Sequence, residues 1–348
     1  MKACLTLLPA ALAVLLLAGC DREPAPQPEP AAVAAPTEAA AEYAALASAY
    51  EEESAPQLRR LVVAAPGFRE AVGALLRQPD AAQLEAAQNA WALLYRHFSR
   101  AWPVLASRAA LTPQLAPPLA RADIWPILPG YVDAVPGWPE SGIVYDVTLT
   151  LDTETLLAQQ DMTDPAEVSV GLQVLHQLLA GVPEAPRAAL DLTAVTELLP
   201  SHQLPLRELP ENRRRSYLDV ASALLLEDLT LLIQPREAPT PEQLVAALLQ
   251  ALADAQLRLA KLAAYADAGD PGGGEYMAPQ AHQIASTETR AAVDVWFDPQ
   301  TPQGAALAAV LEAVAPDYAG ELAALLTEEP HDHAALARLL SAPPVGLF

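Results

Sequence analysis

The chain has 348 residues, of which 52% are hydrophobic, so it can bury a sizeable core and does not have the composition of a disordered protein. Acidic residues outnumber Lys and Arg 43 to 20, which gives a formal net charge of −23. Nucleic-acid binding needs clustered basic side chains, so we expect no nucleic-acid partner. Solubility is the simplest reason for the acidic balance, although it also favours cations near the surface.

The N-terminus has the features of a targeting segment. Lys2 precedes an apolar run over residues 5–17 that is too short to span a membrane comfortably as a helix. The run ends in Leu-Ala-Gly-Cys at residues 17–20, which resembles the lipobox of bacterial lipoproteins. The resemblance implies a signal peptide over residues 1–19 and acylation of Cys20. We therefore expect a protein of the bacterial cell envelope that faces the periplasm and is anchored to membrane lipid through Cys20.

A proline-rich tether is expected next, followed by short helices. Residues 20–37 contain five prolines and little to bury, which is typical of an extended tether. Apolar residues at helical spacing then predict helices over residues 38–53, 58–63 and 66–77. Pro66 would open the third of these, because proline fits the first turn of a helix.

Asp80 is predicted to cap the first long helix, with Gln83 at the third helical position. Pro103 would end this helix. Its apolar stripe consists of Leu84, Ala87, Trp91, Leu94, Tyr95, Phe98 and Trp102. His97 lies beside the stripe and is expected to be a core or boundary residue instead of a ligand.

Residues 103–150 form a segment rich in proline and aromatic residues, and its prolines exclude continuous helix over much of its length. The segment must nevertheless fold onto the protein, because it carries large aromatic side chains such as Trp125 and Tyr131. Asp123 and Asp133 flank these aromatic residues. The segment is either a packed cap over helices or part of a functional site.

Residues 164–181 are predicted to form a helix with one polar line on an otherwise apolar surface. Asp164 can cap it, and Gly181 would end it. Ser169, Gln173 and His176 share one face at helical spacing. Gly171 would let a neighbouring backbone approach this line closely. A buried helix with such a line is where we expect a site.

The second half of the chain is predicted to be helical as well. Long helices are expected over residues 211–234 and, after a capping box at Thr240, over residues 240–268. A shorter helical piece is expected over residues 188–199, and two or three short helices over residues 301–340. Residues 147–151 alternate apolar and polar side chains as a strand would, but no partner strand can be found, so the sequence predicts an all-α fold.

Two clusters of charged or titratable residues lie in this half of the chain. Arg213, Arg214 and Arg215 open the 211–234 helix, where a solvated first turn is favoured over a salt bridge or an anion contact. His331, Asp332 and His333 combine two imidazoles with a carboxylate. Adjacent positions on a helix point in different directions, so this triplet is a weak metal site.

Several segments together resemble the imelysin family, the peptidase M75-like and iron-regulated periplasmic lipoproteins. The resemblance covers essentially the whole chain after the tether. It rests on the order and spacing of the matching segments. These are DIWP at residues 123–126, YVD at 131–133, SGI at 141–143, GLQVLH at 171–176 and RRRSYL at 213–218, with a looser match around residues 286–289.

The resemblance implies two helical-bundle domains, which we place at residues 38–183 and 184–348, with a site at their interface. The family motif Gly-x-His-x-x-Glu is proposed to bind metal, because His and Glu three apart share a helix face. Here Gly171 is kept, but Gln173 replaces the His and His176 replaces the Glu. Gln173 is a poor ligand for transition metals, and the carboxylate that could serve as a general base is missing.

The leading hypothesis is a non-catalytic envelope lipoprotein that acts in iron or metal acquisition as a binding or accessory module. Its cofactor would be a divalent metal or iron, with His176 as a metal ligand, and its partners other iron-uptake proteins of the envelope. The alternatives are a metallopeptidase with altered ligands and a structural partner of another envelope protein. The site between the domains would involve Asp123, Trp125, Tyr131, Asp133, Gly171, Gln173, His176 and Ser286.

Overall fold

Helices make up nearly all of the regular structure. The computed structural model describes residues 38–199, 203–268, 274–328 and 330–344. Within these ranges the only sheet is an antiparallel pair of two-residue strands, β1 (Gly181–Val182) and β2 (Ala185–Pro186). The all-α fold class is therefore confirmed. The predicted signal peptide, the lipidated Cys20 and the tether lie outside the described residues.

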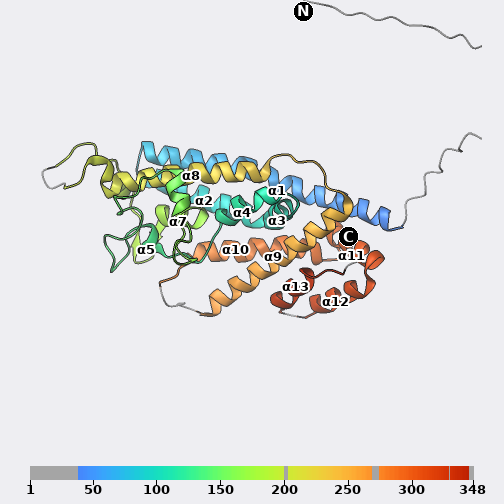
Figure 1. Cartoon of the computed structure of the whole chain (residues 1–348). Helices are drawn as coiled ribbons and strands as arrows, with labels where there is room; N and C mark the ends of the chain where they lie inside the picture. The colour runs from blue at the N-terminus through green and yellow to red at the C-terminus, as the bar shows by residue number, and fades with distance from the viewer. Residues whose placement is uncertain (1–37, 200–202, 269–273, 329, 345–348) are drawn as a thin grey trace, which may run out of the picture. The chain divides into compact units, whose positions relative to one another are not determined.

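The helices pack as long antiparallel rods with shorter pieces between them (Figure 1). No helix in the described ranges is long and apolar enough to cross a membrane. The helices in chain order are α1 (Glu38–Arg77), α2 (Ala81–Arg100), α3 (Trp102–Leu111), η1 (Pro113–Leu115), α4 (Ala116–Ala122), α5 (Pro129–Val132), α6 (Thr153–Ala158), α7 (Leu172–Ala180), η2 (Ala189–Leu192), η3 (Leu206–Glu208), α8 (Pro210–Ile233), α9 (Pro241–Ala268), α10 (Pro279–Phe297), α11 (Pro302–Val314), α12 (Pro316–Leu326) and α13 (His333–Leu340).

Helix α1 corrects the first prediction, because the three expected short helices are one continuous helix. Pro56 and Pro66 lie inside it. A proline in a helix interior costs about 3 kcal/mol, so local propensity alone breaks the chain there. The apolar residues on either side of these prolines, such as Leu61 and Phe68, are fully buried against α2 and α8. Tertiary burial therefore outweighs the local cost.

The proline-rich segment is also more helical than expected in its first part. Helices α3 and α4 occupy most of residues 102–122, interrupted only by η1 and Thr112. The prolines fall in the first turns of these helices, where a missing amide proton costs nothing because that proton would have no partner in the helix. From Asp123 onward the segment is irregular, apart from α5.

The predicted helix over residues 164–181 is wrong in its first half. Its capping residues do form a local turn, in which Asp164 accepts from the amide of Ala166 and Glu167 accepts from the amide of Thr163. The chain then runs without helix to Gly171, and α7 begins only at Leu172. Gly171 has φ = +97°, a backbone conformation that ends any helix approaching from the N-terminal side.

Most of the remaining helix predictions are confirmed, and residues 188–199 are the exception. Helix α8 matches its predicted range to within one residue at each end, and the capping box at Thr240 is present in both directions. The two or three short helices predicted near the C-terminus are present as α11, α12 and α13. Over residues 188–199, only the turn η2 is helical, because its closing bonds span three residues and do not propagate.

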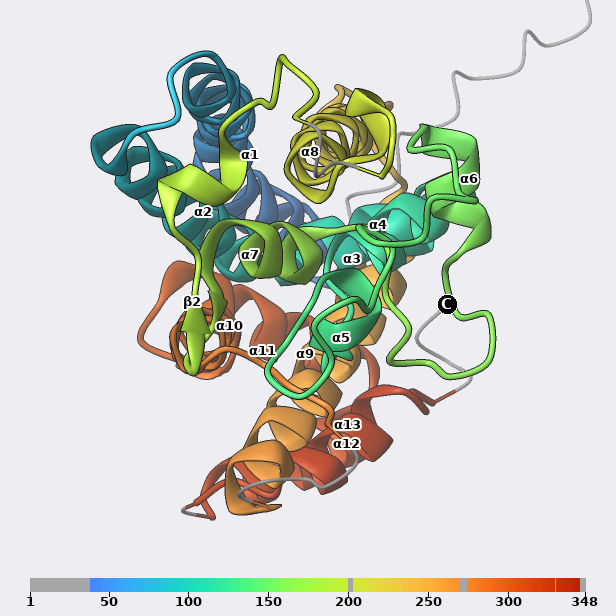
Figure 2. The ribbon, with the colours of Figure 1, turned by 90° about the vertical axis from the view of Figure 1, so that its left-hand side faces the viewer.

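Two large groups of buried side chains hold the helices together. The first gathers α2, α3, α4, α7 and α8 around the second half of α1, and Figure 2 shows α7 beside α2 and α8, both of which it contacts. The second gathers α11, α12 and α13 around the first half of α9 and includes Leu46 of α1. The division into domains at residues 183 and 184 stays a prediction.

Candidate functional site

The carboxylate of Asp123 is the centre of a buried polar cluster at the motif helix. Asp123 directly follows α4 and is 7% exposed. Its Oδ1 accepts from Nε2 of Gln173 on α7 at 2.7 Å. Its Oδ2 accepts from Nη2 of Arg258 at 2.6 Å and from the hydroxyl of Tyr95 at 3.1 Å. The predicted pair Asp123 and Gln173 is thus brought together, with partners that were not predicted.

Arg258 supplies the positive charge of this cluster from α9. Besides Asp123, its guanidinium donates to the hydroxyls of Thr289 and Tyr95, both at 3.3 Å. The guanidinium carbon lies 4.7 Å from the ring centre of Trp102 and 5.4 Å from that of Trp125. Burial lowers the pKa of Arg258, but its interactions with Asp123 and Tyr95 together outweigh burial and raise the pKa. We call Tyr95, Asp123, Gln173, Arg258 and Thr289 the Asp123 cluster; it is charge-balanced.

Asp133 belongs to a separate buried ion-pair group. Arg214 on α8 donates to both of its oxygens, at 2.6 and 3.1 Å, and Arg187 donates to Oδ2 at 2.6 Å. Asp191 lies 3.8 Å from Arg187 and balances the second positive charge. Asp133 itself is fully buried. The structure therefore assigns Asp133 to the anchoring of α8, away from the Asp123 cluster.

The arginine triplet is not a solvated first turn, which corrects the favoured prediction. Arg213 and Arg214 are buried. Arg215 donates to the carbonyls of Leu76 and Leu192, both at 2.7 Å. Arg213 gathers four backbone carbonyls at 2.6 to 3.0 Å, those of Ile143, Val144, Asp146 and Leu149. These arginines thus donate to carbonyl oxygens of irregular segments and helix ends, which have no regular backbone partner for them.

His176 lies one turn beyond Gln173 but does not reach Asp123. Its ring packs on Trp91, with ring centroids 4.5 Å apart, and forms no hydrogen bond within the described residues. Burial lowers the pKa of His176 to about 4, so the imidazole is neutral at neutral pH. It borders a small cavity of about 170 Å³ that Gln88, Asn89 and Gln280 also line.

Gly171 sets the distance between α7 and α4, as expected. A Cβ atom at this position would lie 2.3 Å from the carbonyl oxygen of Arg121. Arg121 is itself paired with Asp228 of α8. The close approach brings the first turn of α7 against the end of α4, where Asp123 begins, and so places Gln173 within reach of the carboxylate.

The residues at the motif helix do not fit the metal that the family resemblance implies. Both oxygens of Asp123 are occupied by protein donors, one of them a guanidinium cation. Gln173 turns its amide nitrogen toward that carboxylate, and nitrogen of a neutral amide is not a metal ligand. Across the described part of the chain, no group of three or more His, Cys, Asp or Glu side chains could hold a metal ion.

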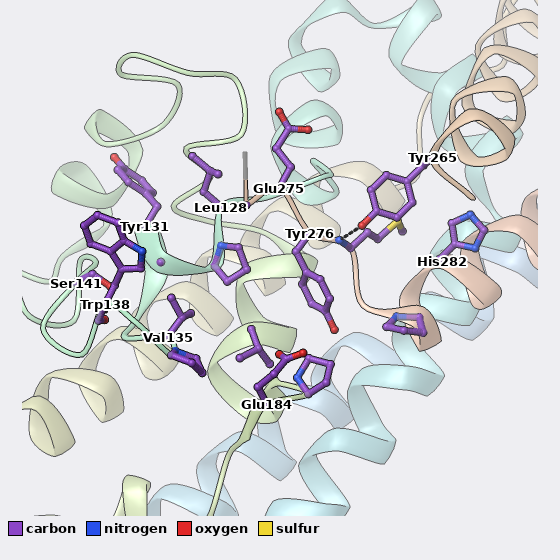
Figure 3. A pocket seen from close by; sticks show the side chains of 18 of the residues that line it. Leu128, Tyr131, Val135, Trp138, Ser141, Glu184, Tyr265, Glu275, Tyr276 and His282 are labelled. Carbon is purple, nitrogen blue, oxygen red and sulfur yellow. Dashed lines mark hydrogen bonds between the residues drawn. The ribbon is translucent and has the colours of Figure 1, made fainter. Parts of the chain in front are cut away.

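Tyr131 and Ser286 lie apart from the cluster. The hydroxyl of Tyr131 donates to the carbonyl of Gln159 at 2.6 Å, and its ring lines an open groove of about 1120 Å³ (Figure 3). Ser286 is on α10, where its buried hydroxyl has no partner within the described residues. Six of the eight predicted site residues are therefore divided among the Asp123 cluster, an ion-pair group, an open groove and two isolated positions. The other two border the cluster: Trp125 lies beside Arg258, and Gly171 packs against the end of α4.

Tyr95, Arg258 and Thr289 are site residues that the sequence predictions missed, but Arg258 had a detectable signal. It occupies a position in the apolar stripe of α9, where the other members are buried. These are Leu244, Leu248, Ala251, Ala255 and Leu262, at alternating spacings of four and three. A charged residue on a buried stripe needs a buried partner of opposite charge, so the pattern itself calls for an acidic residue elsewhere.

Comparison with known proteins gives one result. The model of the family described as imelysin matches residues 54–337, which takes in α2 to α12 and most of α1. A search among curated proteins finds no match.

Proposed function

The chain belongs to the imelysin family, and from this premise we propose that it is a non-catalytic lipoprotein of the cell envelope. In this proposal it acts in iron or metal acquisition as a binding or accessory module. Its iron-related role and envelope location follow from what the family resemblance and the lipobox imply. Its lack of catalysis rests on one observation, the occupied carboxylate of Asp123.

Charge and geometry at the motif helix both disfavour catalysis. A metal-dependent hydrolase needs a metal with an open coordination position and a general base, usually a carboxylate. Asp123 is the carboxylate that bonds the motif residue Gln173, and Arg258 lies 2.6 Å from its other oxygen. A divalent cation there would face the guanidinium at close range in a buried setting, where like charges repel strongly. Asp123 therefore serves as the counter-ion of Arg258.

Metal content and peptide cleavage test the absence of catalysis. We expect the purified mature protein to retain no stoichiometric iron, zinc or copper after equilibrium dialysis, as read by elemental analysis. We also expect no chelator-sensitive cleavage of a peptide library. His176→Ala is the matched control, because it removes the one imidazole on the motif helix. Chelator-sensitive cleavage that His176→Ala abolishes would restore the metallopeptidase alternative, whereas stoichiometric metal without cleavage would favour a metal-binding module over an accessory one.

A genetic experiment tests the role in iron acquisition. Deletion of the gene in its own bacterium should slow growth on medium depleted of iron by a chelator, and the wild-type gene should restore it. His176→Ala should also restore growth, because in the proposal this imidazole binds no metal. Growth that does not depend on the gene would leave the structural alternative, which co-purification from solubilised membranes examines.

The proposed lipid anchor has its own test. Cys20→Ala removes the acylated residue, so the protein should move from the membrane fraction to the soluble fraction and lose labelling by a fatty-acid analogue. A Cys4→Ala variant changes the other cysteine of the chain, which is expected to leave with the signal peptide, and should behave as wild type. Membrane association that persists in Cys20→Ala would contradict lipidation at that residue.

A further inference from the structure

The open groove that Tyr131 lines is walled by aromatic rings and prolines (Figure 3). It lies where the segment after Asp123, the β1–β2 turn, the end of α9 and the start of α10 come together. Its volume of about 1120 Å³ is sufficient for a small-molecule ligand or a short peptide. We call it the tyrosine groove; its aromatic and imidazole walls are Tyr131, Trp138, Tyr265, Tyr276 and His282.

The ring positions in the groove are fixed by the fold. Tyr276 exchanges two backbone hydrogen bonds with Ile127, at 2.7 and 2.9 Å. The hydroxyl of Tyr265 accepts from the amide of Met277 at 2.7 Å. The His282 ring lies near that of Tyr265 and bonds the carbonyl of Leu262 at 2.8 Å. The groove is therefore largely preorganised, which reduces the entropy lost when a ligand binds.

The groove carries negative charge without a counter-charge. Among the residues that the structure describes, Glu184 and Glu275 are its charged lining residues, and no Lys or Arg lines it. Among the described residues neither glutamate forms an ion pair or a hydrogen bond. Burial, the neighbouring Tyr265 and the charge of Glu184 raise the pKa of Tyr276, so its hydroxyl stays protonated. Figure 3 shows the Tyr276 side chain extending toward Glu184.

We propose that the tyrosine groove binds organic cations, ligands that carry an ammonium or guanidinium group. Aromatic faces attract such cations through their quadrupoles, and each face contributes about 0.5–2 kcal/mol. Glu184 and Glu275 supply the opposite charge, while an anionic ligand would meet repulsion from both. Arg258 shows the same preference inside this protein, since its guanidinium lies over two tryptophan rings. The proposal does not depend on a role in metal handling.

The cation could be a small molecule or a side chain of a basic peptide, and calorimetry with matched probes separates these sources. The probes are argininamide, its uncharged analogue citrullinamide, and the peptide Ala-Arg-Ala-Arg-Ala, each acetylated at its α-amino nitrogen so that guanidinium groups are the only cations. Argininamide should bind at least tenfold more tightly than citrullinamide, and added salt should weaken its binding. A peptide that binds at least tenfold more tightly than argininamide would identify a peptide side chain as the source. Equal binding of argininamide and citrullinamide, or no binding of argininamide and the peptide, overturns the proposal.

Variants of the groove complete the test. The double change Glu184→Gln with Glu275→Gln should lower the affinity for argininamide at least tenfold, and Tyr276→Leu should lower it about fivefold. Glu140→Gln is the matched control, because Glu140 is exposed, close in sequence to Trp138, and absent from the groove lining. It should bind as wild type. An unchanged affinity in the double variant, with native circular dichroism, contradicts the proposed role of the glutamates.

Discussion

The Asp123 cluster and the tyrosine groove use the same helices in opposite ways. Seven residues, or about two helical turns, separate Arg258 from Tyr265 on α9 and His282 from Thr289 on α10. At one level the helices present Arg258 and Thr289, whose side chains bond each other, and Arg258 also bonds Asp123. Two turns away they border a groove whose two acidic groups have no such partner among the described residues.

This difference indicates which of the two regions is structural and which can bind a ligand. Buried polar groups are normally paired, and a fully paired cluster fixes how helices pack. A ligand can add little to it without breaking bonds that already exist. Unpaired charges beside aromatic faces can still form favourable interactions with a ligand. The cluster should therefore determine stability, and the groove should determine binding.

Removal of Arg258 should give the largest loss of stability. Arg258→Ala leaves the buried Asp123 carboxylate without its counter-charge, which costs about 3–5 kcal/mol in the free energy of unfolding. Urea denaturation followed by circular dichroism measures this loss. If the single variant does not fold, Asp123→Asn, which keeps the shape and removes the charge, provides a second measurement of the same pair.

A double variant separates charge from packing at this site. Asp123→Leu with Arg258→Met replaces the pair by apolar side chains of similar length, so it should be more stable than Arg258→Ala alone. A double variant that is less stable than the single one would show that the hydrogen bonds of the cluster, and not its uncompensated charge, dominate. A loss below about 1 kcal/mol in Arg258→Ala would contradict the structural role of the cluster.

Substitution of Gly171 should be the next largest effect. Gly171→Ala introduces a side chain at φ = +97° and places its Cβ 2.3 Å from the carbonyl of Arg121. The strained backbone alone costs about 1–3 kcal/mol, and relief of the clash moves α7 away from α4. We expect lower stability together with altered near-ultraviolet circular dichroism, because Trp91 contacts α7 through the carbonyl of Leu172. Gly67→Ala, in α1 with open space around it, is the control.

Protonation of His176 should give a smaller effect that depends on pH. Burial lowers its folded-state pKa to about 4, below the unfolded value of 6.5, so the unfolded chain binds the proton more readily. The stabilising contribution is therefore complete above pH 6.5 and is lost as the pH falls toward 4. Between pH 7 and 4.5 this loss is about 2–2.5 kcal/mol.

The control for this pH dependence is His176→Gln, which retains a polar side chain that does not titrate. Because the carboxylates titrate in both proteins, the difference between the two stability profiles isolates the histidine. The profiles should diverge between pH 6.5 and 4. Parallel profiles would mean that His176 is as accessible to protons in the folded protein as in the unfolded chain.

Local sequence signals predicted the helices whose ends are determined locally. Thr240 and Gln243 bond each other's backbone amides, and Asp80 accepts from the amide of Gln83, so both helix starts could be found by inspection. The same rule failed at Asp164, where the turn forms but the helix does not continue. Propagation there is stopped by Gly171, whose close contact with Arg121 comes from a distant part of the chain.

The candidate site was less predictable because its partners come from distant segments. The family resemblance placed Asp123 and Gln173 in one site, and they do meet. It gave no reason to separate Asp133, whose arginine partners come from residues 187 and 214. Arg214 also lies on a buried stripe, with Leu218, Ala221 and Leu225 at helical spacing. This pattern of a charged residue on an apolar stripe would have predicted a buried ion pair for Arg214 instead of a solvated first turn.

The smallest effect on stability is expected in the groove, and it completes the comparison with the cluster. Glu184→Gln with Glu275→Gln breaks no ion pair or hydrogen bond within the described residues. The free energy of unfolding should therefore stay within about 0.5 kcal/mol of wild type, as is usual for surface changes. Any shift should be toward higher stability, because the formal net charge of −23 is reduced in magnitude and self-repulsion falls. Urea denaturation at low ionic strength measures the shift, and the same experiment in high salt should abolish it. A loss of 2 kcal/mol or more, on the scale expected for a broken buried contact, would mean that the glutamates stabilise the fold as Asp123 does. The distinction between a structural cluster and a binding groove would then be wrong.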